Sequence, residues 1–290
     1  MQTQVLSILA GLGGMIGWGT SDFFAGLFSK KIGYLKTLFW SQMAGLLFAS
    51  SFILFFPFSW NMSFLILFLL PVSAVIFALA YLLFYRALEI GSVAIISATL
   101  NLWGVFTPLI AFLFLGQRLS GYQTVGICMI MFGVLLTSLK WSDLKLGSVK
   151  LLAGIKETVL SAFLFGIFWN LSDIISKQIG WLSTTLFIKI GVLLFLIAYS
   201  LIAGKKMGMV KTTAKTKLMV ALVGILEAIA VMSVNFGLTV GRVILVSPIS
   251  SALSIITITL AVIFLKDKIT GSQVFGMVLA VLGIALTAFS

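Results

Sequence analysis

Long runs of apolar residues alternate with short polar segments along the whole chain. A transmembrane helix needs roughly 20 consecutive, mostly apolar residues, and most of these runs reach about that length. The pattern therefore predicts an all-α polytopic membrane protein with ten transmembrane helices. The expected spans are 5–28, 34–56, 64–86, 91–115, 121–138, 157–178, 182–203, 218–239, 243–265 and 271–289.

The chain also repeats itself. Residues 91–138 align without gaps on residues 241–288, with identical glycine, serine and glutamine positions. The first span recurs in the sixth, where three residues return at the same spacing: Trp18, Ser21 and Asp22 match Trp169, Ser172 and Asp173. The repeat divides the chain into a first five-helix copy, 1–139, a basic connecting loop, 140–156, and a second five-helix copy, 157–290.

An odd number of spans in each copy determines their relative orientation. The second copy must begin on the opposite side of the membrane from the first, so the two copies lie inverted. Inverted repeats are typical of secondary transporters, which hold their substrate near the middle of the membrane between the copies. The repeat therefore predicts a transporter with a cavity at the midplane.

The amino-acid composition supports a membrane protein and limits the kinds of metal or catalytic site that the chain could hold. Hydrophobic residues make up 61% of the 290 residues and charged residues 9%, whereas soluble domains are about half apolar and a quarter charged. The chain has no histidine and one cysteine, Cys128, which argues against a disulfide, a zinc cluster or a Cys–His nucleophile. We expect no metal, no cofactor and no catalytic residues. A membrane-embedded enzyme is disfavoured because no nucleophile–base pair is visible.

The net charge of +12 is distributed unevenly over the connections. The basic residues lie in short loops between spans, which predicts a membrane topology rather than a nucleic-acid partner. Among the 19 Lys and Arg residues, only Arg118, Lys177 and Arg242 lie at even-numbered connections, and Lys189 lies inside a span. Positive residues favour the cytoplasmic side. We therefore expect a multi-pass protein of the plasma (inner) membrane, with the odd-numbered loops in the cytoplasm and both termini outside.

Two helix–turn–helix segments correspond in the two copies: Phe114-Leu115-Gly116-Gln117-Arg118-Leu119-Ser120, with Gln123 and Gly126, and Phe264-Leu265-Lys266-Asp267-Lys268-Ile269-Thr270, with Gln273 and Gly276. Together with Trp18-Gly19, these segments resemble the ten-helix, EamA-type branch of the drug/metabolite transporter superfamily. The family loop typically reads Gly-Glu-Arg-Leu, and here the glutamate is replaced by Gln117 and Asp267. The resemblance implies transport of small metabolites, such as amino acids, sugars or nucleotide precursors, or of toxic compounds. It also implies cytoplasmic termini; the charges of this sequence predict the opposite, and we follow the charges.

Four ionisable residues lie inside the expected spans: Asp22, Asp173, Lys189 and Glu227. A charge at the bilayer centre costs about 2.5–3.5 kcal/mol on insertion scales and marks a functional candidate. Glu227 lies closest to the middle of its span and shares a helix face with Asn235. It could couple transport to protons or bind a substrate cation. The alternative is a carboxyl that hydrogen-bonds a neighbouring helix for packing.

Asp173 and Lys189 flank the short connection between the sixth and seventh spans at similar depth. We expect them to form an ion pair, which is a weak indication of function, although a substrate carboxylate could compete for Lys189. Asp22 has no lysine at the matching position, where Ser41 and Gln42 stand, and its helix face includes Trp18 and Ser21.

Aromatic and neutral polar residues complete the expected cavity. Membrane tryptophans usually mark the interfaces, but Trp18, Trp103 and Trp169 fall near the middle of their spans. The fourth and ninth spans carry polar stripes, and Pro108 and Pro248 there are candidate bending points. The alternative is a packing role, with indoles and hydroxyls bonded to helix carbonyls. The candidate substrate-binding residues are Trp18, Asp22, Tyr81, Tyr85, Asn101, Trp103, Trp169, Asp173, Lys189, Glu227, Asn235 and Ser251.

These features predict a secondary-active transporter of small, partly apolar, amino-acid-like metabolites, which works by alternating access around a midplane cavity. The alternative is a multidrug or organic-cation exporter, which the same acid and cation–π contacts would serve. A channel is disfavoured because no acidic ring or filter-like motif is visible. The expected partners are the lipid bilayer and a small-molecule substrate, with protons as a candidate coupling ion. The sequence leaves the substrate, the transport direction and the oligomeric state open.

Overall fold

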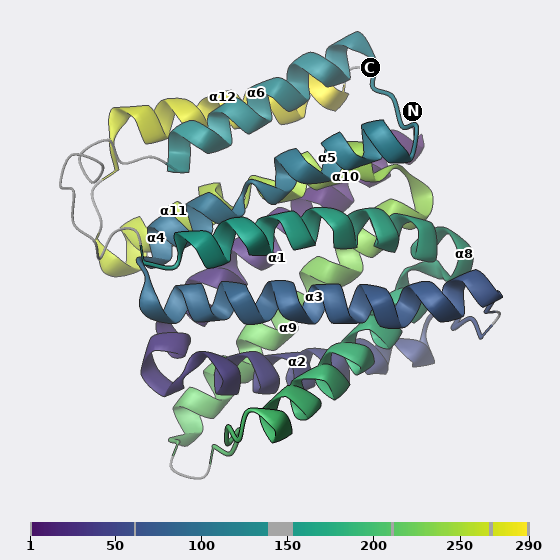
Figure 1. Cartoon of the computed structure of the whole chain (residues 1–290). Coiled ribbons are helices and arrows are strands. Elements are labelled where there is room, and N and C mark those ends of the chain that lie inside the picture. Colours follow the sequence, from purple (N-terminus) through teal and green to yellow (C-terminus); the bar gives the residue numbers. More distant parts are fainter. Residues whose placement is uncertain (1, 61, 139–152, 210–211, 267–268, 289–290) are drawn as a thin grey trace.

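The computed structural model describes residues 2–60, 62–138, 153–209, 212–266 and 269–288. Every regular element within those residues is a helix (Figure 1). Most of the connecting loop 140–156 lies outside the described residues, as does Asp267 of the second family-like segment. The elements are α1 (Gln2–Ile32), α2 (Tyr34–Ser50), η1 (Ser51–Leu54), α3 (Phe64–Ile90), α4 (Val93–Leu100), α5 (Trp103–Phe114), α6 (Gly121–Ser138), α8 (Ile155–Ile202), α9 (Ala214–Val240), α10 (Val243–Ser251), α11 (Ser254–Leu265) and α12 (Gly271–Ala288).

Among the described residues, six helical segments are long and apolar enough to cross a membrane, and two shorter apolar helices accompany them. The helix α1 is not among the six, because its glycines and polar residues lower its mean hydropathy. The chain is therefore a multi-pass membrane protein built from helices. The six segments are Tyr34–Leu54, Phe64–Ile90, Ile95–Phe114, Ile155–Ile202, Ala214–Val240 and Val243–Phe264, and the shorter helices are Gly121–Thr137 and Gly271–Thr287.

The helix α8 joins two expected spans, 157–178 and 182–203, into one element. Its backbone turns at Gly180, where φ is 80° and ψ is 163°, a conformation that residues with a Cβ avoid. Figure 1 shows the chain crossing the bundle before this turn and returning after it. The two expected spans are thus the two arms of a helical hairpin.

Two further expected spans are interrupted near their middle. Regular helix stops at 101–102, between α4 and α5, and at 252–253, between α10 and α11. At both places backbone N–H groups bond three residues back instead of four, which tightens the turn. Pro108 and Pro248, the candidate bending points, lie inside α5 and α10 rather than at these interruptions.

The packing of the helices follows the internal repeat. The helices α6 and α12, which end the two copies, approach closely through glycines. A Cβ at Gly133 would lie 2.5 Å from the carbonyl oxygen of Gly276, and a Cβ at Gly126 would lie 2.7 Å from that of Gly283. Gly126 is the repeat equivalent of Gly276, and Gly133 that of Gly283. The contact is therefore symmetric between the copies, and α3 packs along α8 as α9 packs along α1.

The connections separate to opposite ends of the bundle. Both termini and the turn of α8 lie at one end, and the segments that join α1 to α2 and α3 to α4 lie at the other (Figure 1). At the end with the termini, Nη1 of Arg242 donates to the carbonyl oxygen of Arg118 over 2.8 Å. At the other end, Nζ of Lys205 donates to the hydroxyl of Tyr34 over 2.8 Å, and this hydrogen bond raises the pKa of Lys205 above its usual value.

Candidate functional site

A pocket lies between helices of the two copies, and its empty volume, which includes space open to solvent, is about 300 Å³. Aromatic and aliphatic side chains from α1, α3, α4, α5 and α8 form nearly all of its wall. Asp22 is the single carboxylic acid in that wall. The lining residues are Trp18, Asp22, Tyr81, Phe84, Leu100, Trp103, Phe165, Trp169 and Leu253.

Three tryptophans on three different helices meet in this wall. The ring centroids of Trp18 and Trp169 are 5.2 Å apart, those of Trp18 and Trp103 5.7 Å, and those of Trp103 and Trp169 6.1 Å. Each indole is at most 5% exposed. The buried Nε1 of Trp18 has no hydrogen-bond partner among the described residues. Buried indole N–H groups usually find an acceptor, so this one is available to a molecule in the cavity.

Asp22 follows Trp18 by one helical turn and lines the same cavity. The carboxyl is 3% exposed, and no described residue forms a hydrogen bond or ion pair with it. The adjacent Ser21 donates to the carbonyl oxygen of Val223 on α9 over 3.1 Å, and Gly17 lets α1 approach Ala230 of α9 closely. These contacts fix the rotation of α1 and leave the face of Trp18 and Asp22 toward the cavity.

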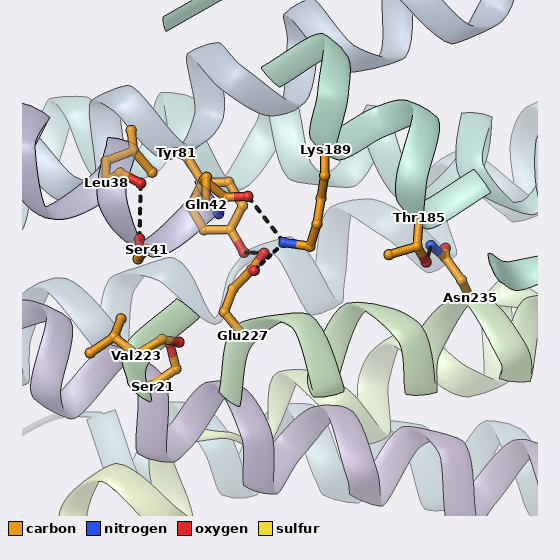
Figure 2. Close-up of polar contacts among 10 residues, drawn as sticks. All are labelled: Ser21, Leu38, Ser41, Gln42, Tyr81, Thr185, Lys189, Val223, Glu227 and Asn235. Carbon is orange, nitrogen blue, oxygen red and sulfur yellow. Dashed lines mark hydrogen bonds and ion pairs between the residues drawn. The ribbon is translucent and has the colours of Figure 1, made fainter. Parts of the chain in front are cut away.

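A buried ion pair joins α8 to α9, and Figure 2 shows it with the neighbouring Gln42 and Tyr81. Nζ of Lys189 on α8 binds Oε2 of Glu227 on α9, and the two side chains are 0% and 1% exposed. Nζ of Lys189 also donates to Oε1 of Gln42 on α2 over 3.1 Å. The hydroxyl of Tyr81 donates to Oε1 of Glu227 over 2.9 Å. Because Tyr81 also lines the cavity, it connects the ion pair to the wall beside Asp22.

Residues related by the internal repeat touch each other at this place. Trp18 and its equivalent Trp169 are in ring contact, and Gln42 and its equivalent Lys189 are hydrogen-bonded. Two residues exchanged by a two-fold operation can touch only near its axis. The cavity and the ion pair therefore lie on the line that relates the two copies to each other.

A family model, the EamA-like transporter family, matches residues 5–139 and 152–289, which is nearly the whole chain and follows its two halves. The chain belongs to the EamA-like transporter family. A solved structure described only as "Crystal structure of protein" shares the fold, with a TM-score of 0.71, 18% sequence identity, and coverage of 98% of this chain and 96% of that one. A comparison with curated proteins found no match.

The family fold brings some predicted site residues together and separates others. Trp18, Asp22, Tyr81, Trp103 and Trp169 meet in the cavity wall. The ion pair that we expected between Asp173 and the lysine on the second arm of α8 does not form, because that lysine binds the acid on α9. The turn of the hairpin sets the depth of both residues, but the rotation of each arm about its own axis decides which neighbour each side chain meets.

Asp173 instead belongs to a separate polar cluster at the end of the bundle with the termini. Its Oδ2 accepts from Nζ of Lys177 over 2.7 Å and from Nε2 of Gln117 over 2.9 Å. Oε1 of Gln117 accepts from the backbone N–H of Ile244 over 3.1 Å. Gln117, which stands where the family usually has glutamate, thus ties the α5–α6 connection to α8 and α10.

The remaining candidates are buried away from the cavity wall. Nδ2 of Asn235 donates to Oγ1 of Thr185 over 2.9 Å, and its Oδ1 accepts from Ser172 over 2.8 Å. The amide therefore joins α9 to both arms of α8. The hydroxyl of Ser251 donates within its own helix to the carbonyl oxygen of Pro248 over 2.8 Å. Both side chains are therefore hydrogen-bonded within the bundle.

Tyr85 is 0% exposed and Asn101 is 4% exposed, and neither lines the cavity. Sequence reasoning missed several wall residues whose positions carried a signal. Phe165 precedes Trp169 by one helical turn, and Leu253 is the repeat equivalent of Trp103. Helical spacing and repeat equivalence from the recognised tryptophans would have found them.

Proposed function

We propose that the protein is a secondary-active transporter that moves small, partly apolar molecules by alternating access. The observation that carries the proposal is the aromatic cavity that contains Asp22 and lies beside the Lys189–Glu227 ion pair, on the line that relates the two copies. Ionisable groups are costly at membrane depth and are retained mainly for function. Membership of a transporter family supports the same conclusion.

We propose further that ten helices cross the membrane as two inverted copies, 1–139 and 157–290. Several features support this arrangement. The two arms of α8 count as two spans, the pairs α4–α5 and α10–α11 count as one interrupted span each, and both termini lie at the same end of the bundle (Figure 1). With this arrangement the two-fold line lies in the membrane plane, which places the cavity near the midplane.

The end of the bundle with the termini would then face outward, because the connections at the other end carry most of the basic residues. A reporter enzyme that is active only in the cytoplasm, fused after residue 290, should be inactive. The same reporter inserted in the 203–213 connection should be active. Activity of the terminal fusion would reverse the orientation and leave the transport proposal intact.

Alternating access would require the ends of the cavity to open in turn. At the end with the termini, the Gln117 contacts to Asp173 and to the N–H of Ile244 join the α5–α6 connection to α8 and α10, and the interruptions at 101–102 and 252–253 lie where helices can bend. In this scheme Glu227 remains a candidate proton-coupling group. Its carboxylate is bonded to Lys189 and to Tyr81, so a proton reaching it would loosen α9 from α8 and α3.

The test is flux through the purified protein in liposomes. A thermal-stability screen in detergent with amino acids, sugars, nucleosides and quaternary ammonium compounds selects a ligand, since a ligand at about 100 times its Kd stabilises by roughly 2.7 kcal/mol. Liposomes preloaded with that ligand should then show saturable counterflow of the labelled compound. Flux that rises linearly with concentration would contradict a carrier.

The second candidate function is an exporter of organic cations. It is favoured by the position of Asp22 among the tryptophans of the cavity wall.

A further inference from the structure

The charges beside the cavity do not balance. Two carboxyl groups, Asp22 and Glu227, and one ammonium, Lys189, lie in this buried region, and the ammonium is bound to Glu227. No ion pair joins Asp22 to a described residue, and Glu227, Tyr81 and Tyr85, which interact with it electrostatically, supply no positive charge. Within the described part of the chain, Asp22 therefore has no counter-ion.

A buried carboxylate without a counter-ion is costly. Asp22 must either carry a proton or face a positive charge that enters the cavity. The wall around it is suited to one class of cation. Three indoles, from Trp18, Trp103 and Trp169, surround the space next to the carboxyl, and aromatic faces attract ammonium groups, tryptophan most strongly.

Other ligand classes fit this wall less well. A calcium or magnesium ion needs six or more oxygen ligands, whereas the wall offers the Asp22 carboxyl and the Tyr81 hydroxyl, which already donates to Glu227. An anion would meet the Asp22 carboxyl with no free cation beside it, because Lys189 is bound to Glu227 and Gln42.

We infer that the cavity binds an organic ammonium ion between the Asp22 carboxylate and the three indoles, and that this ion exchanges there with a proton. The inference deepens the proposed function, on which it rests for its transport role, by naming the substrate class. The exchange conserves charge. The proton leaves the Asp22 carboxyl oxygen for the water of the compartment to which the cavity is open, and the ammonium takes its place as the counter-ion.

The test uses the purified full chain in detergent and benzyltrimethylammonium as the probe. Intrinsic tryptophan fluorescence should change saturably as the probe is added, while benzyl alcohol, an uncharged aromatic of similar size, should have no such effect. Calorimetry in two buffers of different ionisation enthalpy should show release of roughly one proton per bound cation. Equal binding of benzyl alcohol, or binding of sodium with the same fluorescence change, would overturn the inference.

The repeat provides a matched pair of variants. Asp22→Asn should weaken binding by about 30-fold or more and abolish proton release. Asp173→Asn, which changes the equivalent position in the other copy but lies outside the cavity, should bind like the wild type. Asp22→Glu keeps the charge and should retain the preference for the cation over the alcohol, which controls for misfolding of Asp22→Asn. Equal losses in the Asp22→Asn and Asp173→Asn variants would contradict a site at Asp22.

The aromatic wall is tested separately. Trp103→Leu introduces the residue that the other copy carries at the equivalent position, Leu253, and should weaken cation binding roughly 3- to 30-fold without changing proton release. Unchanged affinity would show that the indoles do not contribute to cation binding.

The binding and flux experiments together distinguish a failure of the cation-site inference from a failure of the transport proposal. If the wild type ignores the ammonium probe but shows saturable counterflow of an uncharged ligand, the inference is wrong and the transport proposal stands. If it binds the probe with proton release but shows no counterflow in liposomes, the cation site stands and the transport proposal is wrong.

Discussion

Asp22 and Asp173 occupy equivalent positions in the two copies of the repeat, and the structure gives them opposite surroundings. Asp22 lies in an aromatic wall without a hydrogen-bond or ion-pair partner among the described residues, whereas Asp173 is bonded to Lys177 and Gln117 near the end of the bundle. Both are nearly inaccessible, at 3% and 2% exposure. Burial therefore does not distinguish them; their partners do.

The difference shows how two copies of a repeat can produce an asymmetric site. A duplicated backbone places equivalent residues on equivalent helix faces, and residues near the two-fold line then meet each other. Where the two copies keep the same residue type, as at Trp18 and Trp169, the contact is symmetric. Where they differ, as at Gln42 and Lys189, the line acquires a charge that only one copy supplies.

The largest expected effect comes from removing Lys189, the charged residue of the ion pair that only the second copy supplies. Lys189→Leu leaves the Glu227 carboxylate buried without its cation, and we expect a loss of about 3–5 kcal/mol in the free energy of unfolding. The double variant Lys189→Leu with Glu227→Leu removes both charges and should recover most of this loss. Denaturant unfolding in mixed micelles measures both. A double variant as unstable as the single one would show that the charges are not the cause.

The next effect tests the symmetric contact between α6 and α12. Gly133→Ala would place a Cβ 2.5 Å from the backbone oxygen of Gly276, and separating the two helices should cost about 1–3 kcal/mol. Gly121→Ala on the same helix meets nothing within 4 Å and serves as the control, with no loss expected. Thermal unfolding in detergent compares the two variants, and equal melting temperatures would contradict the close helix contact.

A smaller effect should distinguish Asp173 from Asp22 by how much each contributes to the stability of the ligand-free protein. Asp173→Asn loses the ion pair with Lys177 and weakens the bond from Gln117, so we expect a loss of about 1–2 kcal/mol. Asp22→Asn breaks no hydrogen bond to a described residue and should cost no stability. The same unfolding assay ranks the pair, and the reverse order would mean that Asp22 has an undetected partner.

The smallest effect concerns Lys177 alone. Its side chain is 40% exposed, and half-exposed ion pairs contribute at most about 1 kcal/mol because water and salt screen them. Lys177→Ala should therefore change the unfolding free energy by less than Asp173→Asn does. A loss as large as that of Lys189→Leu would show that the Asp173 cluster is as tightly coupled as the ion pair on the two-fold line.

The sequence by itself determined the positions of the helices and the equivalence of the two copies. Apolar run length predicted segments such as 64–86, which lies within α3, because a membrane span requires about 20 apolar residues. The repeat predicted which residues of the two copies are equivalent, and it identified Trp169 as the equivalent of Trp18. The tryptophans and acids stood out because such side chains are costly or unusual in the middle of a span.

Only the tertiary structure decided which partners these side chains meet. Periodicity along one helix gives the face that a residue occupies, but the direction of that face depends on how the helix is rotated and packed in the bundle. For this reason the sequence paired Lys189 with Asp173 at similar depth, while the folded chain pairs it with Glu227 from a helix further along. The same packing surrounded Asp22 with indoles and left it without a counter-ion among the described residues, because Ser21 and Gly17 hold α1 against α9 through an adjacent face of the helix.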